Sequence, residues 1–495
     1  MNDFNIRNAT IIDGSGGPAK QTDLGIKDCR IAEIGQVGSA DSELDAAGNC
    51  LAPGLIDTHA HDDGAFLKHP DMTFKLSQGV TTVVNGNCGF SAIPLDNNGD
   101  VSKGSGGILA GIESGFTDLE GYFSAVLARK PAINNMMLVG HNTVRSLVMG
   151  SQRRAPSSKE LSAMVDHVDR AMEQGACGFS TGLIYRPGRY SETEEIIELA
   201  RVAQPYGGLY TTHMRNEGDR LLEAIDETLK IGKEANIHAH ISHHKAAGKQ
   251  NWGKVKSSLE KINAALATGQ QISLDVYPYT AGSGRMIEYF NLDNINRQLA
   301  EVIRLASCPA FREYEGRMLK DIATEKGIDI VHLVHEILTS PKGDRTICIQ
   351  FIIDETDIET NLRWQDMMVG SDGIPDLNGS PHPRLFGTFP RILGHYVRDK
   401  QLLSLTDAVR RMTSLAASTF GLNQRGLIKQ GYWADLVLFN PDTVADAATY
   451  DEPKKLATGI EAVFVNGKLA YRNGEYTQSG SGQMLRYKRE SYKAL

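Results

Sequence analysis

The alternation of hydrophobic and polar residues changes character twice along the chain. Near the start, "FNIRNATIID" and "LGIKDCRIAEIG" alternate with period two and are separated by the turn-rich "DGSGGPAK". The same pattern returns in "GLIKQGYWADLVLFN" and "IEAVFVNGKLAYRNGEY", where Asn466-Gly467 is typical of a hairpin turn. The pattern predicts β-strands in residues 1–53 and 423–480, and we expect the two segments to form one small β-sandwich. Residues 481–495 are a polar tail without a predicted element.

Between these ends, in residues 54–422, short apolar runs alternate with segments of helical periodicity. The runs are 55–59, 80–84, 136–140, 176–181, 208–213, 237–243, 271–277 and 367–372. A capping box, Ser157 with Glu160, precedes one helical segment, and "SLTDAVRRMTSLAASTFG" predicts another. Eight strand-then-helix units predict an α/β fold of the (β/α)8 TIM-barrel type, with a doubly wound sheet as the weaker alternative. The stretch of about 283–365 is too long for one loop and one helix, so we expect a helical lid insertion over the barrel mouth.

Residues suited to metal binding and proton transfer occur where the apolar runs end, which is the rim at which barrel enzymes place their chemistry. His59 and His61 are two apart at the end of the first run, so their side chains point to one side. Taken together, the candidates favour a transition metal, most simply zinc, held by imidazole and thiolate. The run ends are His59, His61, Asn87, Cys88, His141, Asn142, Ser180, Thr181, His213, His243, His244, Tyr277 and Asp372.

Each candidate also has an ordinary structural interpretation. A free cysteine such as Cys88 is usually a small buried hydrophobe, although "NGNCGFS" allows the backbone to fold closely around an ion. Asp372 is either a turn residue before a glycine or a carboxylate that moves a proton. His244 points away from His243 on a continuing strand, which favours the interior. The cations Lys245, Arg215 and Arg384 either face solvent or bind an anionic substrate.

Composition narrows the classes of protein. The chain has 495 residues, 41% hydrophobic and 23% charged, with a net charge of −8, which favours neither a nucleic-acid partner nor a membrane. We find no secretory signal and no long apolar span, and six cysteines lack a disulfide framework spacing, so we expect a cytoplasmic protein. The sequence carries no signal for oligomeric state.

Several motifs together resemble the N-acyl-D-amino-acid deacylases (D-aminoacylases) of the amidohydrolase superfamily. They are "GLIDTHAHDD", "GVTTVVNGNCGFS", "THMRNEGD", "ISHHKAAGKQNWGK", "DVYPYTAGS", "VGSDG", "HPRLFGTFPRILGHYVRD" and "GYWADLVLFNP". The resemblance implies the same barrel, terminal β-sandwich and mobile lid. It also implies one tightly bound Zn²⁺ on Cys88, His213 and His243, with His59 and His61 binding a weaker second metal. Asp372 would be the catalytic base and then acid. The residues implied to bind the substrate α-carboxylate are Lys245, Tyr277, Arg384 and, as an assistant, Ser283.

The implied reaction is zinc-dependent hydrolysis of the amide bond of a small N-acyl-D-amino acid by activated water. A cyclic amidase such as a hydantoinase is the alternative enzyme, although "ACGFSTGL" lacks the metal-bridging lysine expected on its fourth strand. A non-catalytic scaffold protein is the third possibility. The sequence does not decide which substrate side chain is preferred. Arg285 would select an acidic side chain, whereas Ile184 would line a pocket for an apolar one.

Overall fold

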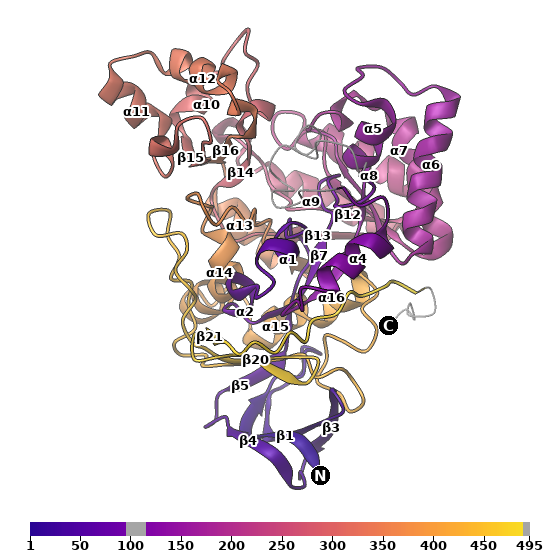
Figure 1. The fold of residues 1–495 in the computed structure, drawn as a ribbon, viewed down its shortest axis with the longest axis vertical. Helices are drawn as coiled ribbons and strands as arrows, with labels where there is room; N and C mark the ends of the chain where they lie inside the picture. Colours follow the sequence, from indigo (N-terminus) through magenta and orange to yellow (C-terminus); the bar gives the residue numbers. More distant parts are fainter. Residues whose placement is uncertain (96–114, 489–495) are drawn as a thin grey trace.

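The computed structural model describes residues 1–95 and 115–488. Within these ranges, eight parallel strand positions form a barrel (Figure 1). The strands are β6 (Leu55–Asp57), β7 (Val80–Asn85), β8 (Asn134–Met137) continued by β9 (Val139–Gly140), β10 (Gly178–Gly182), β11 (Leu209–His213), β12 (His238–Ile241), β13 (Ile272–Val276) and β17 (Met367–Val369). Each of the eight predicted apolar runs therefore contributes one barrel position.

The strands of the barrel are buried on both faces. The residues of β7 and β10 are all buried, as expected for strands covered by helices outside and side chains inside. The hydrogen-bonded order is β6-β7-β8 on one side and β17-β13-β12-β11-β10-β9 on the other, and β8 continues into β9. A parallel bridge between Ala60 and Gly373 joins the first strand to the last, so the end of β6 lies beside the end of β17.

Helices cover the outside of the barrel. The capping box predicted for Ser157 and Glu160 is present at the start of α6. The segment predicted as one helix near residue 405 is two helices, because the backbone leaves the helical region at Thr413. The helices that cover the barrel are α1 (Ala65–Lys68), α2 (Thr73–Leu76), α4 (Leu119–Leu127), α5 (His141–Met149), α6 (Ser158–Glu173), α7 (Thr193–Ala203), α8 (Leu221–Glu234), α9 (Lys254–Ala267), α13 (Glu355–Arg363), α14 (Arg384–Arg391), α15 (Leu405–Met412) and α16 (Ser414–Thr419), with a π-helix at Ile392–Asp399.

Both ends of the chain contribute to a second sheet at the bottom of the barrel (Figure 1). It consists of β1 (Asn2–Ile11), β2 (Lys20–Lys27), β3 (Arg30–Gly35), β4 (Ala40–Asp45) and β5 (Cys50–Pro53) with β18 (Leu436–Phe439), β19 (Ile460–Val465), β20 (Lys468–Arg472) and β21 (Glu475–Tyr476). Its own core includes Ile6, Leu24, Leu436 and Phe464. The two ends meet where β5 pairs antiparallel with β18.

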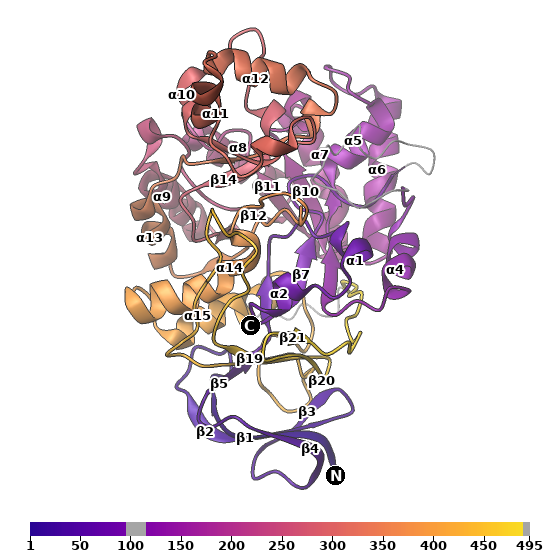
Figure 2. The same cartoon turned by 60° about the vertical axis from the view of Figure 1, so that its left-hand side comes forward.

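A separate unit is inserted between β13 and β17 and extends above the barrel in Figures 1 and 2. Its elements are β14 (Gly282–Arg285), β15 (Ile303–Ser307), β16 (Ile347–Gln350), α10 (Arg297–Glu301), α11 (Leu319–Lys326) and α12 (Ile330–Thr339). The strands pair antiparallel in the order β14-β16-β15, and the unit has its own core from Met286 to Cys348. Helix α13 instead packs on the barrel core through Ile358 and Leu362.

The last described residues return to the barrel. The backbone N–H of Asn135 on β8 donates to Gln483, and Leu485 donates back to Asn135. Tyr487 is buried beside Ala417 and Phe420. Residues 489–495 of the predicted tail lie outside the described ranges.

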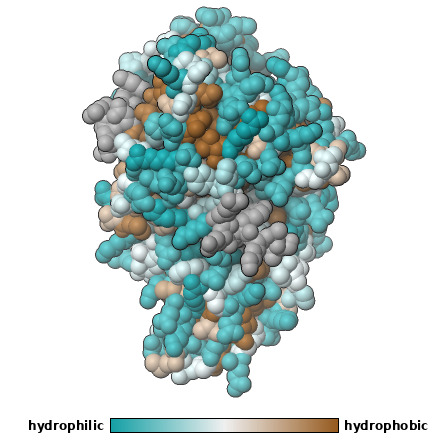
Figure 3. All heavy atoms as spheres, turned by 90° about the vertical axis from the view of Figure 1, so that its right-hand side faces the viewer, coloured by the Kyte–Doolittle hydropathy of each residue, from teal (hydrophilic) through white to brown (hydrophobic). Residues whose placement is uncertain are grey.

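One face of the molecule is mainly hydrophilic. Figure 3 shows this face largely in teal; its largest brown area lies in the upper half, and smaller brown areas lie lower down. In the two described ranges, none of the helices combines the length and apolar composition needed to cross a bilayer.

Candidate active site

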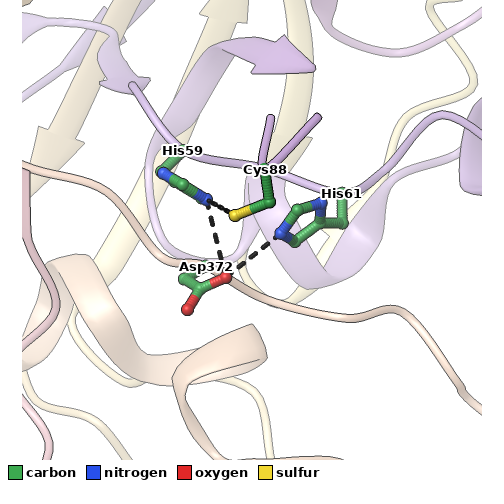
Figure 4. A group of neighbouring side chains, drawn as sticks. All are labelled: His59, His61, Cys88 and Asp372. Carbon is green, nitrogen blue, oxygen red and sulfur yellow. Dashed lines mark hydrogen bonds and ion pairs between the residues drawn. The ribbon is translucent and has the colours of Figure 1, made fainter. Parts of the chain in front are cut away.

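The barrel brings the predicted metal-binding side chains together at its C-terminal rim. His59 and His61 follow β6, and Cys88 follows β7. His213 ends β11, and His243 comes two residues after β12. These side chains are buried although they come from four different strands. Figure 4 shows His59, His61 and Cys88 pointing toward one another and toward Asp372.

Cys88 is the common member of two potential ligand groups. Its Sγ lies 3.3 Å from His59 Nε2, 3.5 Å from His243 Nε2 and 3.8 Å from His213 Nδ1. Zinc–ligand bonds of about 2.0–2.3 Å in a tetrahedron separate ligand atoms by roughly 3.3–3.8 Å. One group is Cys88 with His213 and His243, and the other is Cys88 with His59, His61 and Asp372.

The donor set fits a transition metal better than it fits a purely hydrogen-bonded core. Burial, followed by the charges of Asp372 and Glu217, raises the pKa of the Cys88 thiol well above its usual range. Burial also lowers the pKa of His61 to about 4 and that of His213 well below its ordinary value, so both imidazoles are neutral. Neutral imidazoles are metal ligands, and a bound cation would convert the thiol to the thiolate ligand.

Three of these side chains project from unusual backbone. Cys88, His243 and Asp372 have φ of 54°, 38° and 50°, in the left-handed region that residues with a Cβ seldom occupy. Such conformations persist where the surrounding structure holds them, and they concentrate at functional sites. For Asp372, a backbone hydrogen bond of 2.8 Å to the carbonyl of His59 helps to hold the turn.

Asp372 is held as a carboxylate at the edge of the metal-binding cluster. Its Oδ1 lies 3.1 Å from His61 Nε2, and its Oδ2 accepts from Arg384 Nη2 at 2.9 Å. Burial favours the protonated acid, but the charge of Arg384 and the hydrogen bond from His61 oppose it, and the pKa of Asp372 lies well below its usual range. An ionised carboxylate in this position can accept a proton.

The predicted carboxylate-binding residues line one side of the same rim. Lys245 Nζ lies 5.6 Å from the centre of the Tyr277 ring, and the Arg384 guanidinium lies 4.4 Å from it. Arg384 is fully buried at the start of α14, and its Nη2 donates to the main-chain carbonyl of Ser283 at 3.4 Å. Two cations thus flank one aromatic ring beside Asp372.

Arg285, at the end of β14, is buried and already has partners. Its Nη1 lies 3.7 Å from the Glu288 carboxylate, and its Nη2 donates to the carbonyl of Asp344 at 3.2 Å. Ile184 packs on a small apolar cluster of Phe90, Tyr185 and Cys88 next to the metal-binding group.

Other predicted rim residues are used differently. Arg215 makes a bidentate ion pair with Glu227 and does not join the cluster. The ring nitrogens of His244 bind Ser258 and Asn361 in the core, which agrees with its expected interior position. His141 binds Glu195 at 2.8 Å.

Sequence reasoning missed three buried charged residues that support the site: Glu217, Lys75 and Asp275. Glu217 contacts His243 and Lys245. Lys75 on α2 binds Asp57, and the carboxylate of Asp275 accepts from the backbone N–H of His243. Glu217 and Lys75 lie outside the apolar runs, and only the position of Asp275 inside the run 271–277 indicated that it is buried.

A barrel whose C-terminal rim carries a cluster of imidazoles, a thiol and a carboxylate defines a metal-dependent hydrolase as the class of protein. The model of the amidohydrolase family matches residues 42–471, and the chain belongs to this family.

Within that family, N-acyl-D-amino-acid deacylases are similar to the chain over nearly its whole length. D-aminoacylase from Alcaligenes xylosoxydans xylosoxydans is 42% identical over 489 residues, covering 98% of this chain and 97% of that protein. N-acyl-D-glutamate deacylase from the same organism is 42% identical over 467 residues, covering 94% and 93%. These relatives confirm the resemblance predicted from the motifs.

Solved structures agree with this result. The crystal structure of N-acyl-D-glutamate deacylase from Bordetella bronchiseptica, complexed with zinc and a phosphonate inhibitor, superposes with a TM-score of 0.90 at 40% identity and covers 98% of this chain and 99% of that chain. A D-hydantoinase structure superposes with a TM-score of 0.59 at 17% identity over 98% of this chain and 99% of that chain, and this likeness shows the fold alone.

Proposed function

We propose that the protein hydrolyses the amide bond of N-acyl-D-amino acids, giving a carboxylate and a free D-amino acid. The observation that carries the proposal is the convergence of Cys88, His213 and His243 beside Asp372, with Lys245 and Arg384 on the same rim. The deacylase relatives support the same reaction.

In this proposal, Cys88, His213 and His243 hold one zinc ion tightly, and His59 and His61 provide a weaker second site. When bound, the metal acts as a Lewis acid toward the amide carbonyl and makes water a better nucleophile at neutral pH. Asp372 takes a proton from the attacking water at its carboxylate and passes it to the leaving amide nitrogen. A C–O bond forms, the C–N bond breaks, and Asp372 returns to its ionised state.

Lys245, Tyr277 and Arg384 bind the substrate α-carboxylate, and Ser283 assists through the carbonyl that orients Arg384. Arginine suits this task because its planar fork matches a carboxylate. With the carboxylate and the amide both fixed, the side chain of only one enantiomer points into open space. Stereoselectivity then follows from the positions of the two anchors.

We propose further that the unit from β14 to β16 acts as the lid. Its first strand carries Ser283 and Arg285 at the rim, so movement of the unit would open or cover the site. For the terminal sheet, the separate core shared by both chain ends supports the predicted small β-sandwich. The six cysteines are all free, which supports the expected reducing cytoplasm.

For the substrate side chain, we propose an apolar preference. Arg285 is engaged by Glu288 and the Asp344 carbonyl, whereas Ile184, Phe90 and Tyr185 supply apolar surface next to Cys88. Acidic selection by Arg285 is the second candidate. Turnover of a panel of N-acetyl-D-amino acids distinguishes the two candidates. We expect kcat/KM for the methionine, leucine and phenylalanine derivatives to be higher than kcat/KM for the glutamate derivative. A glutamate preference that Arg285→Met abolishes would instead establish Arg285 as the selector.

The reaction itself is tested with Asp372→Asn and metal analysis. We expect the wild type to hold zinc and to cleave N-acetyl-D-amino acids but not hydantoins, and we expect the variant to lose turnover by roughly 100-fold or more while retaining zinc. Unchanged amidase activity in the variant would remove Asp372 from the mechanism. Turnover of hydantoins alone would favour the cyclic amidase, and inactivity of every zinc-loaded preparation would favour the scaffold protein.

A further inference from the structure

Glu217 is a buried carboxylate that the proposed reaction does not use. It lies in the loop after β11, four residues beyond His213, and it is 8% exposed. Its Oε1 lies 2.5 Å from Lys245 Nζ and 3.0 Å from His243 Nδ1. Its Oε2 lies 3.4 Å from His213 Nε2. One carboxylate therefore contacts two proposed metal ligands and one proposed substrate anchor.

The contacts to the histidines bear on metal binding. Each imidazole turns one nitrogen to Cys88, His213 through Nδ1 and His243 through Nε2, and the other nitrogen to Glu217. An imidazole binds a metal through an unprotonated nitrogen, so its proton must sit on the opposite one. A negative carboxylate on that opposite side favours this tautomer, by the 3.0 Å contact of Glu217 to His243 Nδ1 and by the charge that Glu217 places 3.4 Å from His213 Nε2.

For His243 the carboxylate also opposes a competing neighbour. Lys245 Nζ lies 2.8 Å from His243 Nδ1 and, as a donor, would favour the tautomer with the proton on Nε2. That tautomer points its proton at Cys88 and has no lone pair for a metal. Glu217 Oε1 contacts both the Lys245 ammonium and His243 Nδ1, so the proton on Nδ1 is stabilised even though Lys245 is close by.

The contact to Lys245 bears on the substrate. Lysine has a flexible side chain, and its ammonium carries no directional fork of its own. A buried carboxylate at 2.5 Å fixes the ammonium at the rim, where Tyr277 and Arg384 complete the anion-binding group. The same contact offsets the cost of burying the lysine charge.

We propose that Glu217 is a positioning residue that joins the metal site to the substrate-carboxylate anchor, an inference that rests on the proposed function. Its Oε1 contacts both His243 and Lys245, and its Oε2 faces His213, so one carboxylate favours the metal-binding tautomers of the two imidazoles and orients the lysine. Loss of its charge should therefore weaken metal binding and carboxylate recognition together.

The first experiment measures zinc affinity by competition with a chelator, without substrate. Glu217→Gln preserves size but removes the charge, and we expect its zinc dissociation constant to rise roughly 10–100-fold. Asp219→Asn is the matched control, because Asp219 lies in the same loop and binds Asn251 and Gln250 instead. It should keep wild-type affinity.

The second experiment compares an N-acetyl-D-amino acid with its α-carboxamide at saturating zinc. The ratio of kcat/KM for the two substrates isolates recognition of the carboxylate. We expect the wild type and Asp219→Asn to favour the carboxylate strongly, and Glu217→Gln to lose roughly 10-fold or more of that preference. A general loss of structure would lower both rates and leave their ratio unchanged.

Reduced zinc affinity together with reduced carboxylate preference supports the joint role, and a variant that changes only one of them, or neither, overturns it. If the glutamine variant misfolds, zinc affinity and carboxylate preference are measured in Glu217→Ala instead. Inactivity of the zinc-loaded wild type on all N-acyl-D-amino acids would refute the proposed function instead, and the chelator measurement alone would then decide whether Glu217 positions the histidines.

Discussion

Arg384 connects Asp372, the proposed general base, to the proposed substrate anchor through a single guanidinium. It binds Asp372 at 2.9 Å, lies over Tyr277 and has no exposed surface. Arg384→Met should raise KM roughly 10–100-fold, because a charged hydrogen bond to the substrate carboxylate is lost. It should also lower kcat, because Asp372 loses the ion pair with Arg384 that holds its carboxylate in place. Steady-state kinetics at saturating zinc measure both effects.

Arg391 provides the control for this substitution. It lies on the same helix, α14, but pairs with Asp446 and lies over Tyr279. Arg391→Met should leave KM close to the wild-type value. Equal KM changes in the two variants would show that disturbance of α14, rather than loss of the Arg384 contact, is responsible.

At the residue scale, the sequence predicted the side chains that end barrel strands and missed most of those that support them. His59, His61, Cys88, His213 and His243 could be selected because each ends an apolar run or comes shortly after one. Glu217 and Lys75 are charged residues outside such runs, and charged residues outside buried strands are usually solvated. Their burial depends on contacts between segments far apart in the chain.

The seam between the first and last barrel strands depends on a buried ion cluster. Lys75 Nζ on α2 donates to Asp57 at 2.6 Å and lies 3.2 Å from Asp62, and it also binds the Ser371 hydroxyl at 3.0 Å. Asp57 in turn accepts from the backbone N–H of Ser371 at 2.8 Å. The cluster thus joins the strand that carries the His59–His61 pair to the loop that carries Asp372.

Lys75→Met should destabilise the protein by about 3–5 kcal/mol, because two buried carboxylates, Asp57 and Asp62, lose the cation that pairs with both of them. The midpoint of urea-induced unfolding measures the change. Lys68→Met, on the exposed face of α1, should have little effect. A midpoint for Lys75→Met equal to that of the control would contradict this role of the cluster.

His382 joins α14 to the base of the inserted unit. Its Nε2 donates to the Ala281 carbonyl at 2.9 Å, and its Nδ1 accepts from the backbone N–H of Arg384 at 3.0 Å. Burial, followed by the charge of Arg384, lowers the pKa of His382 well below its ordinary value. Below about pH 6.5 the unfolded chain therefore binds a proton that the folded chain does not.

The free energy of unfolding should consequently fall as the pH decreases below about 6.5, by at most about 1.4 kcal/mol per pH unit from this histidine. In His382→Gln, urea midpoints measured at pH 7.5, 6.5 and 5.5 should decline less steeply than in the wild type. His332→Gln, at an exposed position on α12, should follow the wild-type slope. Identical slopes for His382→Gln and the wild type would contradict the assignment.

At the element scale, the eight apolar runs located all barrel strands, because buried parallel strands are continuously hydrophobic. Helix boundaries were less accurate. The break at Thr413 and the attachment of α13 to the barrel depend on packing rather than on local preference. The pairing of Gln483 and Leu485 with Asn135 was not predictable either, since backbone hydrogen bonds place few demands on side-chain type.

For the whole molecule, closure of the barrel between β6 and β17 brings the candidate site residues together at one rim. The TIM-barrel type of fold was predictable from the order of strands and helices, and membership of the amidohydrolase family agrees with it. The position of the inserted unit above the rim follows from where it leaves and rejoins the barrel, after β13 and before β17.

The central claim is that one thiolate and two imidazoles from distant strands bind the same zinc ion. X-ray absorption at the zinc edge of the purified protein, loaded with one equivalent of zinc, tests it directly. We predict one sulfur at about 2.3 Å together with nitrogen ligands at about 2.0–2.1 Å, and loss of the sulfur in Cys88→Ser. A wild-type spectrum with only nitrogen and oxygen neighbours would contradict the account.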